Sequence, residues 1–509
     1  MAARARQPSI MRCALILATI PAWAGPAVVS GVVLENHTGY AMARSRVKLA
    51  RLVGDRPVAV ETQLTGRSGQ FAFRNVAPGY YFVSAVRTAF AEASYGQRRP
   101  NAPGAPVLVA GDANVFLELR LKRLASIGGR IVDENRSGLP GVTAGAYTHA
   151  PPVRLVASAV SDDRGIYRIS GLPAGRYVVR TSAATLDDGF QLMPTYFPFA
   201  TTNLRDARVV DAELDRETGD VDIQPAPGRL SAISAKAVTG CIPGTEVKVT
   251  LSHETGRREA RIGCLGGFAF QGLAPGEYEL LVEGLTPTGP GAGFDQIGMG
   301  DRERGLGSIR IDQLPNVEAV LTPPIPGAKI LLRRRDLTGA GEVREAGSGK
   351  APLQPGYWDI AAATPPTHFT EKVQGDIWYR AGARYPDPDW FSFSVQHNDR
   401  GKMALILSAP AAAVSGRVTM GGSAAVGAPV YVLPLTAETR RQVNGVKQTI
   451  AGEGGRYAIG GLANGDYLVL ASWDAGEITE ESLRAARATP VKIEGLKAAA
   501  VDLEALAAP

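Results

Sequence analysis

The sequence predicts an all-β protein, a tandem array of about five Greek-key β-sandwiches. One hairpin signature occurs four times, and once more in an altered form, about every 80 to 110 residues along the 509-residue chain. Around each copy, short apolar stretches alternate with Gly/Pro turns, and few stretches have helical periodicity. Repetition at this spacing is typical of a chain of similar small domains.

The repeat rests on one hairpin signature. It consists of an aromatic residue, an apolar residue five positions later, a glycine eight positions later and a tyrosine two positions after that glycine. The aromatic residues are Phe71, Tyr167, Phe268 and Tyr457, the glycines are Gly79, Gly175, Gly276 and Gly465, and the tyrosines are Tyr81, Tyr177, Tyr278 and Tyr467. An altered copy reads Leu353, Gly356 and Trp358. Alternating side chains place the apolar positions of both strands on one core, and the tyrosine hydroxyl can fix the corner.

Each hairpin lies between an opening and a closing strand. Opening strands are expected at 29–33, 127–131 and 414–418, and closing strands at 116–121, 221–223, 317–321, 403–407 and 500–503. The one notable helical stretch is 480–487, and the glycine-rich stretch 284–307 is expected to be a long loop. The predicted parts are a signal peptide at 1–24 and sandwiches at 25–123, 124–226, 227–323, 324–411 and 412–509. The fourth is degenerate because it lacks the aromatic strand before Leu353.

These motifs resemble a known family. The order Val-Ser-Gly-x-Val, Gly-Ala-Pro-Val and Gly-x-Tyr-x-Ile-x-Gly-Leu-x-x-Gly-x-Tyr at 414–467 is similar to the carboxypeptidase regulatory-like domains. The resemblance covers nearly all of the mature chain and is weakest in the fourth unit. It implies immunoglobulin-like or transthyretin-like and starch-binding-like sandwiches, often found in tandem in secreted bacterial proteins. Functions in this family are diverse, so the resemblance implies a fold rather than an activity.

The N-terminus predicts export. Arg4, Arg6 and Arg12 precede an apolar stretch at 13–20, and Ala22-Trp23-Ala24 has the pattern of a cleavage site. The expected location is periplasmic, cell-surface or extracellular. Removing the three signal arginines leaves 52 basic and 49 acidic residues, a net charge of +3, which argues against a nucleic-acid partner. No other stretch approaches 18 apolar residues, so no transmembrane segment is expected in the mature chain.

Two cysteines remain after removal of the signal peptide. Cys241 and Cys264 lie in the third unit, and an oxidising compartment favours a disulfide between them. The alternative is two independent small core residues.

The sequence predicts no enzyme, metal site or cofactor. His368 and Glu371 have the H-x-x-E spacing of paired zinc ligands, but a third ligand in a suitable context is missing, and no hydrolase domain accompanies the repeats. The acidic pair Asp162-Asp163 suggests calcium, although turn formation explains it better. No nucleophile elbow, phosphate-binding loop or dinucleotide fingerprint occurs.

Two aromatic clusters lie outside the repeat. The first is the stretch 196–199, and the second is the predicted ligand-binding site between the fourth and fifth units, which consists of Trp378, Tyr379, Tyr385, Trp390 and Phe391. The second cluster also carries Arg384, Asp387 and Asp389, and this mixture of flat rings and polar groups suits a sugar or a peptide. The alternative is that both clusters are hydrophobic plugs between adjacent sandwiches.

The function expected from the sequence is that of a non-enzymatic, secreted or envelope scaffold or binding protein. Its partner would be a polysaccharide or an envelope protein. One alternative is a carbohydrate-binding protein that uses starch-binding-like sandwiches. A remote alternative is a metallocarboxypeptidase that uses His368 and Glu371.

Overall fold

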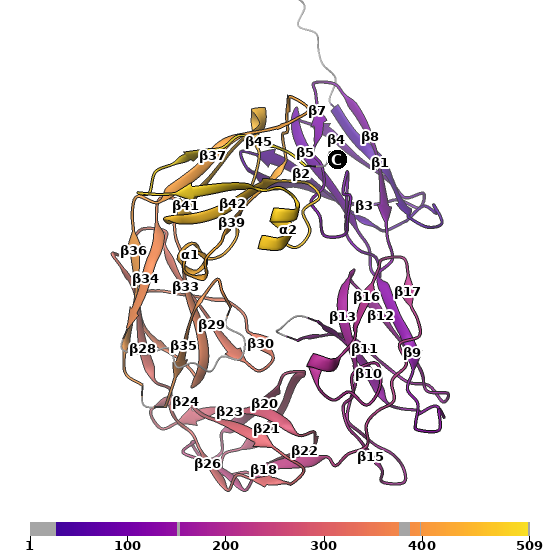
Figure 1. Cartoon of the computed structure of the whole chain (residues 1–509), viewed down its shortest axis with the longest axis vertical. Helices are drawn as coiled ribbons and strands as arrows, with labels where there is room; N and C mark the ends of the chain where they lie inside the picture. Colours follow the sequence, from indigo (N-terminus) through magenta and orange to yellow (C-terminus); the bar gives the residue numbers. More distant parts are fainter. Residues whose placement is uncertain (1–26, 150–152, 376–386, 398, 507–509) are drawn as a thin grey trace, which may run out of the picture.

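The computed structural model describes residues 27–149, 153–375, 387–397 and 399–506. These residues form two-sheet β-sandwiches in tandem, which confirms the predicted fold class. The predicted signal peptide lies outside the described residues. The sandwiches follow one another around a ring, from the indigo first unit to the yellow fifth (Figure 1). Five separate cores span 27–121, 125–223, 233–311, 317–407 and 412–505.

The first sandwich sets the plan that the others repeat. Its opening strand β1 pairs antiparallel with the aromatic strand β4 and parallel with the closing strand β8. This sheet is β4 (Gln70–Val76), β1 (Ala27–Glu35) and β8 (Asn114–Leu121). The facing sheet is β3 (Arg56–Leu64), β2 (Arg46–Val53), β5 (Gly79–Val86) and β6 (Ala93–Ser94), with β7 (Val107–Val109) beside β5. Alternate residues of β1 and β5 meet in the core, as the period of two predicts.

The second and third sandwiches keep this plan. In the second sandwich, one sheet is β12 (Ile166–Leu172), β9 (Ala125–Arg130) and β17 (Glu217–Thr218). The other is β11 (Leu155–Val160), β10 (Thr143–Thr148), β13 (Gly175–Thr181) and β16 (Val209–Ala212). This unit also contains a small hairpin of β14 (Ala184–Thr185) and β15 (Gln191–Leu192) and the 3₁₀ turn Leu204–Asp206. In the third sandwich, one side consists of β22 (Phe268–Leu273), β18 (Ser231–Ala235) and β25 (Arg304–Gly305), together with the short pair β19 (Ala237–Thr239) and β26 (Ser308–Arg310). The facing sheet is β21 (Gly256–Gly263), β20 (Glu246–His253), β23 (Gly276–Thr286), β24 (Gly289–Met299) and β27 (Asp312–Gln313).

The fourth unit, predicted to be degenerate, also has two facing sheets. One is β32 (Gly349–Pro352), β28 (Asn316–Thr322), β36 (Lys402–Ser408) and β34 (Phe369–Gly375), and the other is β30 (Gly339–Ala340), β29 (Lys329–Asp336), β33 (Gly356–Ala363) and β35 (Phe391–Val395), with β31 (Arg344–Ala346) beside β29. The fifth has β38 (Ser423–Ala424), β37 (Ala412–Met420), β41 (Arg456–Leu462), β44 (Ala499–Ala500) and β45 (Leu503–Glu504) facing β40 (Lys447–Ile450), β39 (Pro429–Pro434), β42 (Gly465–Ala471) and β43 (Thr489–Ile493).

Two helices and a 3₁₀ turn, Glu453–Gly455, accompany the fifth sandwich. The predicted helix at 480–487 is observed as α2 (Glu480–Ala485), with a capping box at Thr479. The helix α1 (Ala437–Val443), capped by Thr436, was not predicted. Among the described residues, no helix is both long enough and apolar enough to cross a bilayer.

The glycine of the opening strand is required by a close approach of backbones. A Cβ atom at Gly31 would lie 2.0 Å from the carbonyl oxygen of Leu117, and one at Gly416 would lie 2.0 Å from that of Val501. In the second unit, a Cβ at Gly129 would lie 2.2 Å from the carbonyl oxygen of Val221. The closing strand therefore runs against the opening strand at a distance that only glycine permits.

The residue two positions after each turn glycine fixes the corner by the same hydrogen bond. In every unit its side chain donates to the carbonyl oxygen four residues earlier, at 2.7 to 2.9 Å. The pairs are Tyr81 with Ala77, Tyr177 with Pro173, Tyr278 with Ala274, Trp358 with Gln354 and Tyr467 with Ala463. In the fourth unit the donor is the indole Nε1–H of Trp358, so the altered copy keeps the bond with another side chain.

Two sequence-based assignments are wrong. The strand at 317–321 was expected to close the third unit, but β28 pairs with β32 and β36 and contributes to the fourth core, so the boundary at 324 cuts through the fourth sandwich. The stretch 284–307 was expected to be a loop, but most of it belongs to the long hairpin of β23 and β24. Glycine also lets β27 pair closely with β24, because a Cβ at Gly291 would lie 2.7 Å from the carbonyl oxygen of Asp312.

The ring is closed by contacts between the first and fifth sandwiches. Arg99 forms an ion pair with Asp474, and the Thr449 hydroxyl donates to the Asp55 carboxylate at 3.0 Å. A Cβ at Gly427 would lie 2.4 Å from a ring carbon of Pro106, so the two surfaces are in van der Waals contact. A further bond bridges the second and fourth units, from Arg154 to the carbonyl oxygen of Ala340 at 3.1 Å.

Candidate functional site

The described part of the predicted aromatic site is packed into the junction of the fourth and fifth units. Trp378, Tyr379 and Tyr385 lie outside the described residues. Trp390 is 9% exposed, and the guanidinium carbon of Arg333 lies 4.2 Å from its ring centroid. Phe391, in β35, is half-buried against the fourth core. Neither described ring is an open stacking surface.

The carboxylates beside these rings are paired with arginines. Asp387 lies 2.6 Å from Arg333, and Asp389 lies 2.7 Å from Arg440 of α1. Burial alone would raise the pKa of Asp387, but the hydrogen bonds from Arg333 and from the backbone N–H of Asp389 hold that pKa below its ordinary value. The Asp389–Arg440 pair therefore joins the fourth unit to the fifth, while the Asp387–Arg333 pair lies within the fourth.

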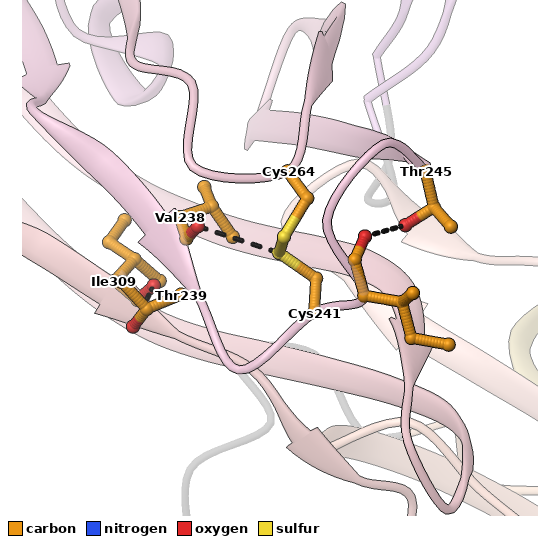
Figure 2. The surroundings of a disulfide bond; sticks show 7 residues. Val238, Thr239, Cys241, Thr245, Cys264 and Ile309 are labelled. Atoms are coloured by element: carbon orange, nitrogen blue, oxygen red, sulfur yellow. Dashed lines mark hydrogen bonds between the residues drawn. A yellow bond between two sulfur atoms is a disulfide. The ribbon is translucent and has the colours of Figure 1, made fainter.

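The two cysteines of the third unit form a disulfide in the structure (Figure 2). Their sulfurs are 2.02 Å apart, and the bond joins the turn after β19 in one sheet to the residue after β21 in the other. Cys241 is buried in the core and Cys264 packs against it. The bond holds the third sandwich together and presents no free thiol.

Two of the residues considered for metal binding, His368 and Asp162, form hydrogen bonds to other groups. Nδ1 of His368 lies 2.9 Å from the Thr367 hydroxyl, and no group of three potential metal ligands occurs among the described residues. The carboxylate of Asp162 accepts from the backbone N–H groups of Arg164 at 3.0 Å and Ile166 at 2.7 Å, as in an Asx turn.

In the first aromatic cluster, Tyr196 is fully buried, Phe197 belongs to the second core and Phe199 is exposed.

A polar network lies buried in the junction of the third and fourth units. Glu279 is 4% exposed, and Gln296 donates to it at 3.4 Å. Burial raises the pKa of Glu279 to about 7, although the charge of Arg334 acts in the opposite direction. Asp336 of the fourth unit accepts from Ser252 at 2.9 Å and from Arg257 at 2.7 Å. This junction therefore contains ionisable groups held out of water.

A cleft lies between the second and third sandwiches. It has a volume of about 220 Å³ and is lined from the second unit by Tyr147 and Arg180 and from the third by His253, Arg258 and Tyr278, among others. No carboxylate lines it among the described residues. Its charged lining is entirely basic.

Arg180 is the unusual residue of this cleft. It is 7% exposed, and its Nε has no hydrogen-bond partner. The guanidinium carbon lies 5.1 Å from the ring centroid of Tyr196, and Arg180 also acts electrostatically on the Tyr147 hydroxyl. Among the described residues it forms no ion pair. A buried cation without a counter-ion is costly unless a ligand supplies one.

The third unit completes the lining. The His253 and Tyr278 rings pack with centroids 4.8 Å apart. Burial raises the pKa of Tyr278, while the charges of Arg258 and Arg180 lower it, so both arginines lie near enough to act on this phenol. Arg258 donates to the backbone carbonyl oxygens of Gln271 and Gly272.

Sequence reasoning missed this cleft because the alternation of β13 predicts an exposed side chain at Arg180. Tyr177 and Val179 face the second core, so Val178 and Arg180 point away from it. Both are nevertheless buried, because Tyr196 and the third unit cover this face. The only available signal was the basic residue at the end of an apolar strand.

No protein-family model and no curated protein matches the sequence. Among solved structures, the chain is similar to GBS52, the minor pilin of Streptococcus agalactiae, with 15% identity, a TM-score of 0.26 and coverage of 40% of this chain and 96% of the pilin. It is similar to the TIE protein of Bacillus anthracis, with 11% identity, a TM-score of 0.18 and coverage of 71% and 68%. It is also similar to the shaft pilin SpaA of Lactobacillus rhamnosus GG, with 11% identity, a TM-score of 0.24 and coverage of 40% and 97%. Likenesses of this size carry no functional argument.

Proposed function

We propose that the chain is an exported, non-enzymatic scaffold protein whose sandwiches form a closed ring. The ring holds the loops and junctions of five units in fixed relative positions, where a partner can bind several of them at once. Its expected location is the periplasm, the cell surface or the extracellular space. Membership of the carboxypeptidase regulatory-like family is part of this proposal and rests on the repeated motif.

The observation that supports a scaffold is the contact between the first and fifth sandwiches. A repeat array that serves only as a spacer needs contacts only between consecutive units. Here the first unit also meets the last, through Arg99 with Asp474 and Asp55 with Thr449. Closure shortens the array and restricts motion between its units, which suits a platform better than a stalk.

The test compares native complexes in the cells that produce the protein. The full chain is expected in an exported fraction, in a complex larger than the 53.5 kDa chain. An Arg99→Glu/Pro106→Arg variant, which opposes ring closure, is expected to remain folded and to leave that complex. The control is Arg67→Glu, an exposed change in the same sandwich. A chain that is always monomeric, or a complex indifferent to ring closure, contradicts the proposal.

We also expect neither peptidase activity nor stoichiometric zinc, because His368 and Glu371 have no third ligand in the described chain. One zinc ion per chain, lost in His368→Ala, would restore the metallocarboxypeptidase alternative. The carbohydrate-binding alternative depends on residues 376–386 and is tested by Trp378→Ala in a glycan-binding assay.

A further inference from the structure

We infer that the cleft between the second and third sandwiches binds a small organic carboxylate, with Arg180 as its main contact. This site goes beyond the scaffold role and does not depend on it. The cleft is formed by two units, and its most buried charged group comes from β13 of the second.

The first argument is the energetic cost of Arg180 in the absence of a ligand. Its side chain is more than nine-tenths buried, its Nε donates to nothing, and no ion pair neutralises it among the described residues. The face of Tyr196 provides a cation–π contact but not a negative charge. Residues that protein stability alone would disfavour are commonly kept for binding.

The second argument is the charge balance, which favours a monoanion. Arg257 is paired with Asp336, so its charge is compensated. Arg258 donates only to neutral carbonyl oxygens, but Glu254 lies near enough to affect the Tyr278 phenol and offsets part of that charge. About one positive charge, that of Arg180, is left for a ligand.

The third argument is shape. A guanidinium is planar and forms two parallel hydrogen bonds with a carboxylate, a geometry that suits carboxylates well. The neighbouring Tyr147, His253 and Tyr278 offer ring carbons and a few polar atoms. At about 220 Å³, the cleft is smaller than the roughly 300–1,000 Å³ of drug-sized sites, so the bound group is small.

The binding experiment uses the full chain and two matched pairs of probes, followed by calorimetry. D-Glucuronate is compared with D-glucose, and triglycine with triglycinamide, so that each pair differs chiefly in the carboxylate. The charged member of at least one pair is expected to bind, and the neutral members are not. The pair that binds distinguishes a sugar acid from a peptide terminus. Inorganic phosphate is expected to bind more weakly than the better carboxylate.

The variants locate the binding. Arg180→Gln is expected to weaken carboxylate binding about tenfold or more. Arg180→Lys should bind better than Arg180→Gln but more weakly than the wild type, because lysine keeps the positive charge without the planar pair of N–H donors. Arg176→Gln, an exposed change in the same strand, is the matched control and should bind as the wild type does. Without ligand, Arg180→Gln should melt no lower than the wild type, because it removes an uncompensated buried charge.

Three outcomes overturn the inference. No probe carboxylate binds, or binding is equal in Arg180→Gln and the wild type, or phosphate binds more tightly than the carboxylates. A marked loss of melting temperature in ligand-free Arg180→Gln would instead assign Arg180 to the packing of the junction.

Discussion

At the scale of single residues, the same side-chain hydrogen bond recurs in all five sandwiches. A side chain two positions after the turn glycine donates to the carbonyl oxygen four residues before it, by a tyrosine hydroxyl in four units and by the indole of Trp358 in the fourth unit. The signature in the sequence predicted the corner but not the reason that tryptophan can replace tyrosine there. The shared requirement is a large apolar body with a donor at its end.

Removing this donor is expected to destabilise the fifth sandwich. Tyr467 and Ala463 are both buried, so Tyr467→Phe leaves a buried carbonyl oxygen without its donor and should cost about 1–2 kcal/mol of unfolding free energy. Chemical denaturation measures the loss. Tyr40→Phe, at a side chain that is 74% exposed, is the control and should be neutral. Equal stability of Tyr467→Phe and the wild type contradicts the role of the corner.

The opening-strand glycine gives a second test at this scale. Gly416→Ala places a Cβ 2.0 Å from the Val501 carbonyl oxygen, so the two strands must separate. We expect a loss of about 3 kcal/mol or more in unfolding free energy. Gly263→Ala has open space around its Cβ and should leave the melting temperature almost unchanged. Similar effects of the two substitutions would show that backbone proximity is not the constraint.

At the scale of elements, the alternating pattern predicts that a strand exists better than it predicts the sandwich to which the strand belongs. The stretch 317–321 was recognised as a strand, but opening and closing strands have the same alternation and pair in parallel, as β28 and β36 do. The pattern therefore cannot say which core the strand serves. The stretch 284–307 was read as a loop because glycine lowers strand propensity, whereas Gly291 is needed there by a neighbouring backbone. α1 was missed because seven residues give little periodicity.

The disulfide ties two elements of the third sandwich. Cys241→Ser/Cys264→Ser is expected to lower the stability of that unit by about 3 kcal/mol, because the bond closes a loop with a sequence separation of 23 in the unfolded chain. Unfolding of the oxidised protein and the variant is compared under the same conditions. Thiol titration of the denatured, unreduced mature chain should find no free thiol, and two free thiols would refute the bond in the exported protein.

The junction between β23 and β29 is expected to weaken as the pH rises. Folding raises the pKa of Glu279 from 4.5 to about 7, so the folded state binds a proton more tightly than the unfolded state does. The resulting stability is complete below about pH 4.5 and is lost as the pH rises through about 7, a change on the order of 3 kcal/mol. Arg334 and Asp336 act on the same carboxylate with opposite signs.

Thermal unfolding at pH 5 and pH 8 tests this coupling. Glu279→Gln removes the titrating group and should stabilise the protein at pH 8 more than at pH 5. Glu277→Gln, on the same strand but facing solvent, is the matched control. A Glu279→Gln variant with the same pH dependence as the wild type contradicts the assignment.

At the scale of the whole molecule, the sequence predicted the units but not their closure into a ring. Closure depends on few residues, such as Pro106 against Gly427, and none of them belongs to the hairpin signature. The buried Arg180 was missed for the same reason, since alternation within one strand says nothing about which unit covers it. Contacts between units differ from one junction to the next, so they do not recur as a repeated pattern in the sequence.

The measurement that tests closure most directly is a cross-link between the first and fifth sandwiches. Asp55→Cys/Thr449→Cys introduces two thiols at positions whose native side chains lie 3.0 Å apart, although they are 394 residues apart in sequence. Mild oxidation or a short bifunctional thiol reagent should join them within one chain and change its mobility on a denaturing, non-reducing gel. The two single variants should show no change. If the double variant forms only dimers, or does not react, the sandwiches form an open array and the closed ring is wrong.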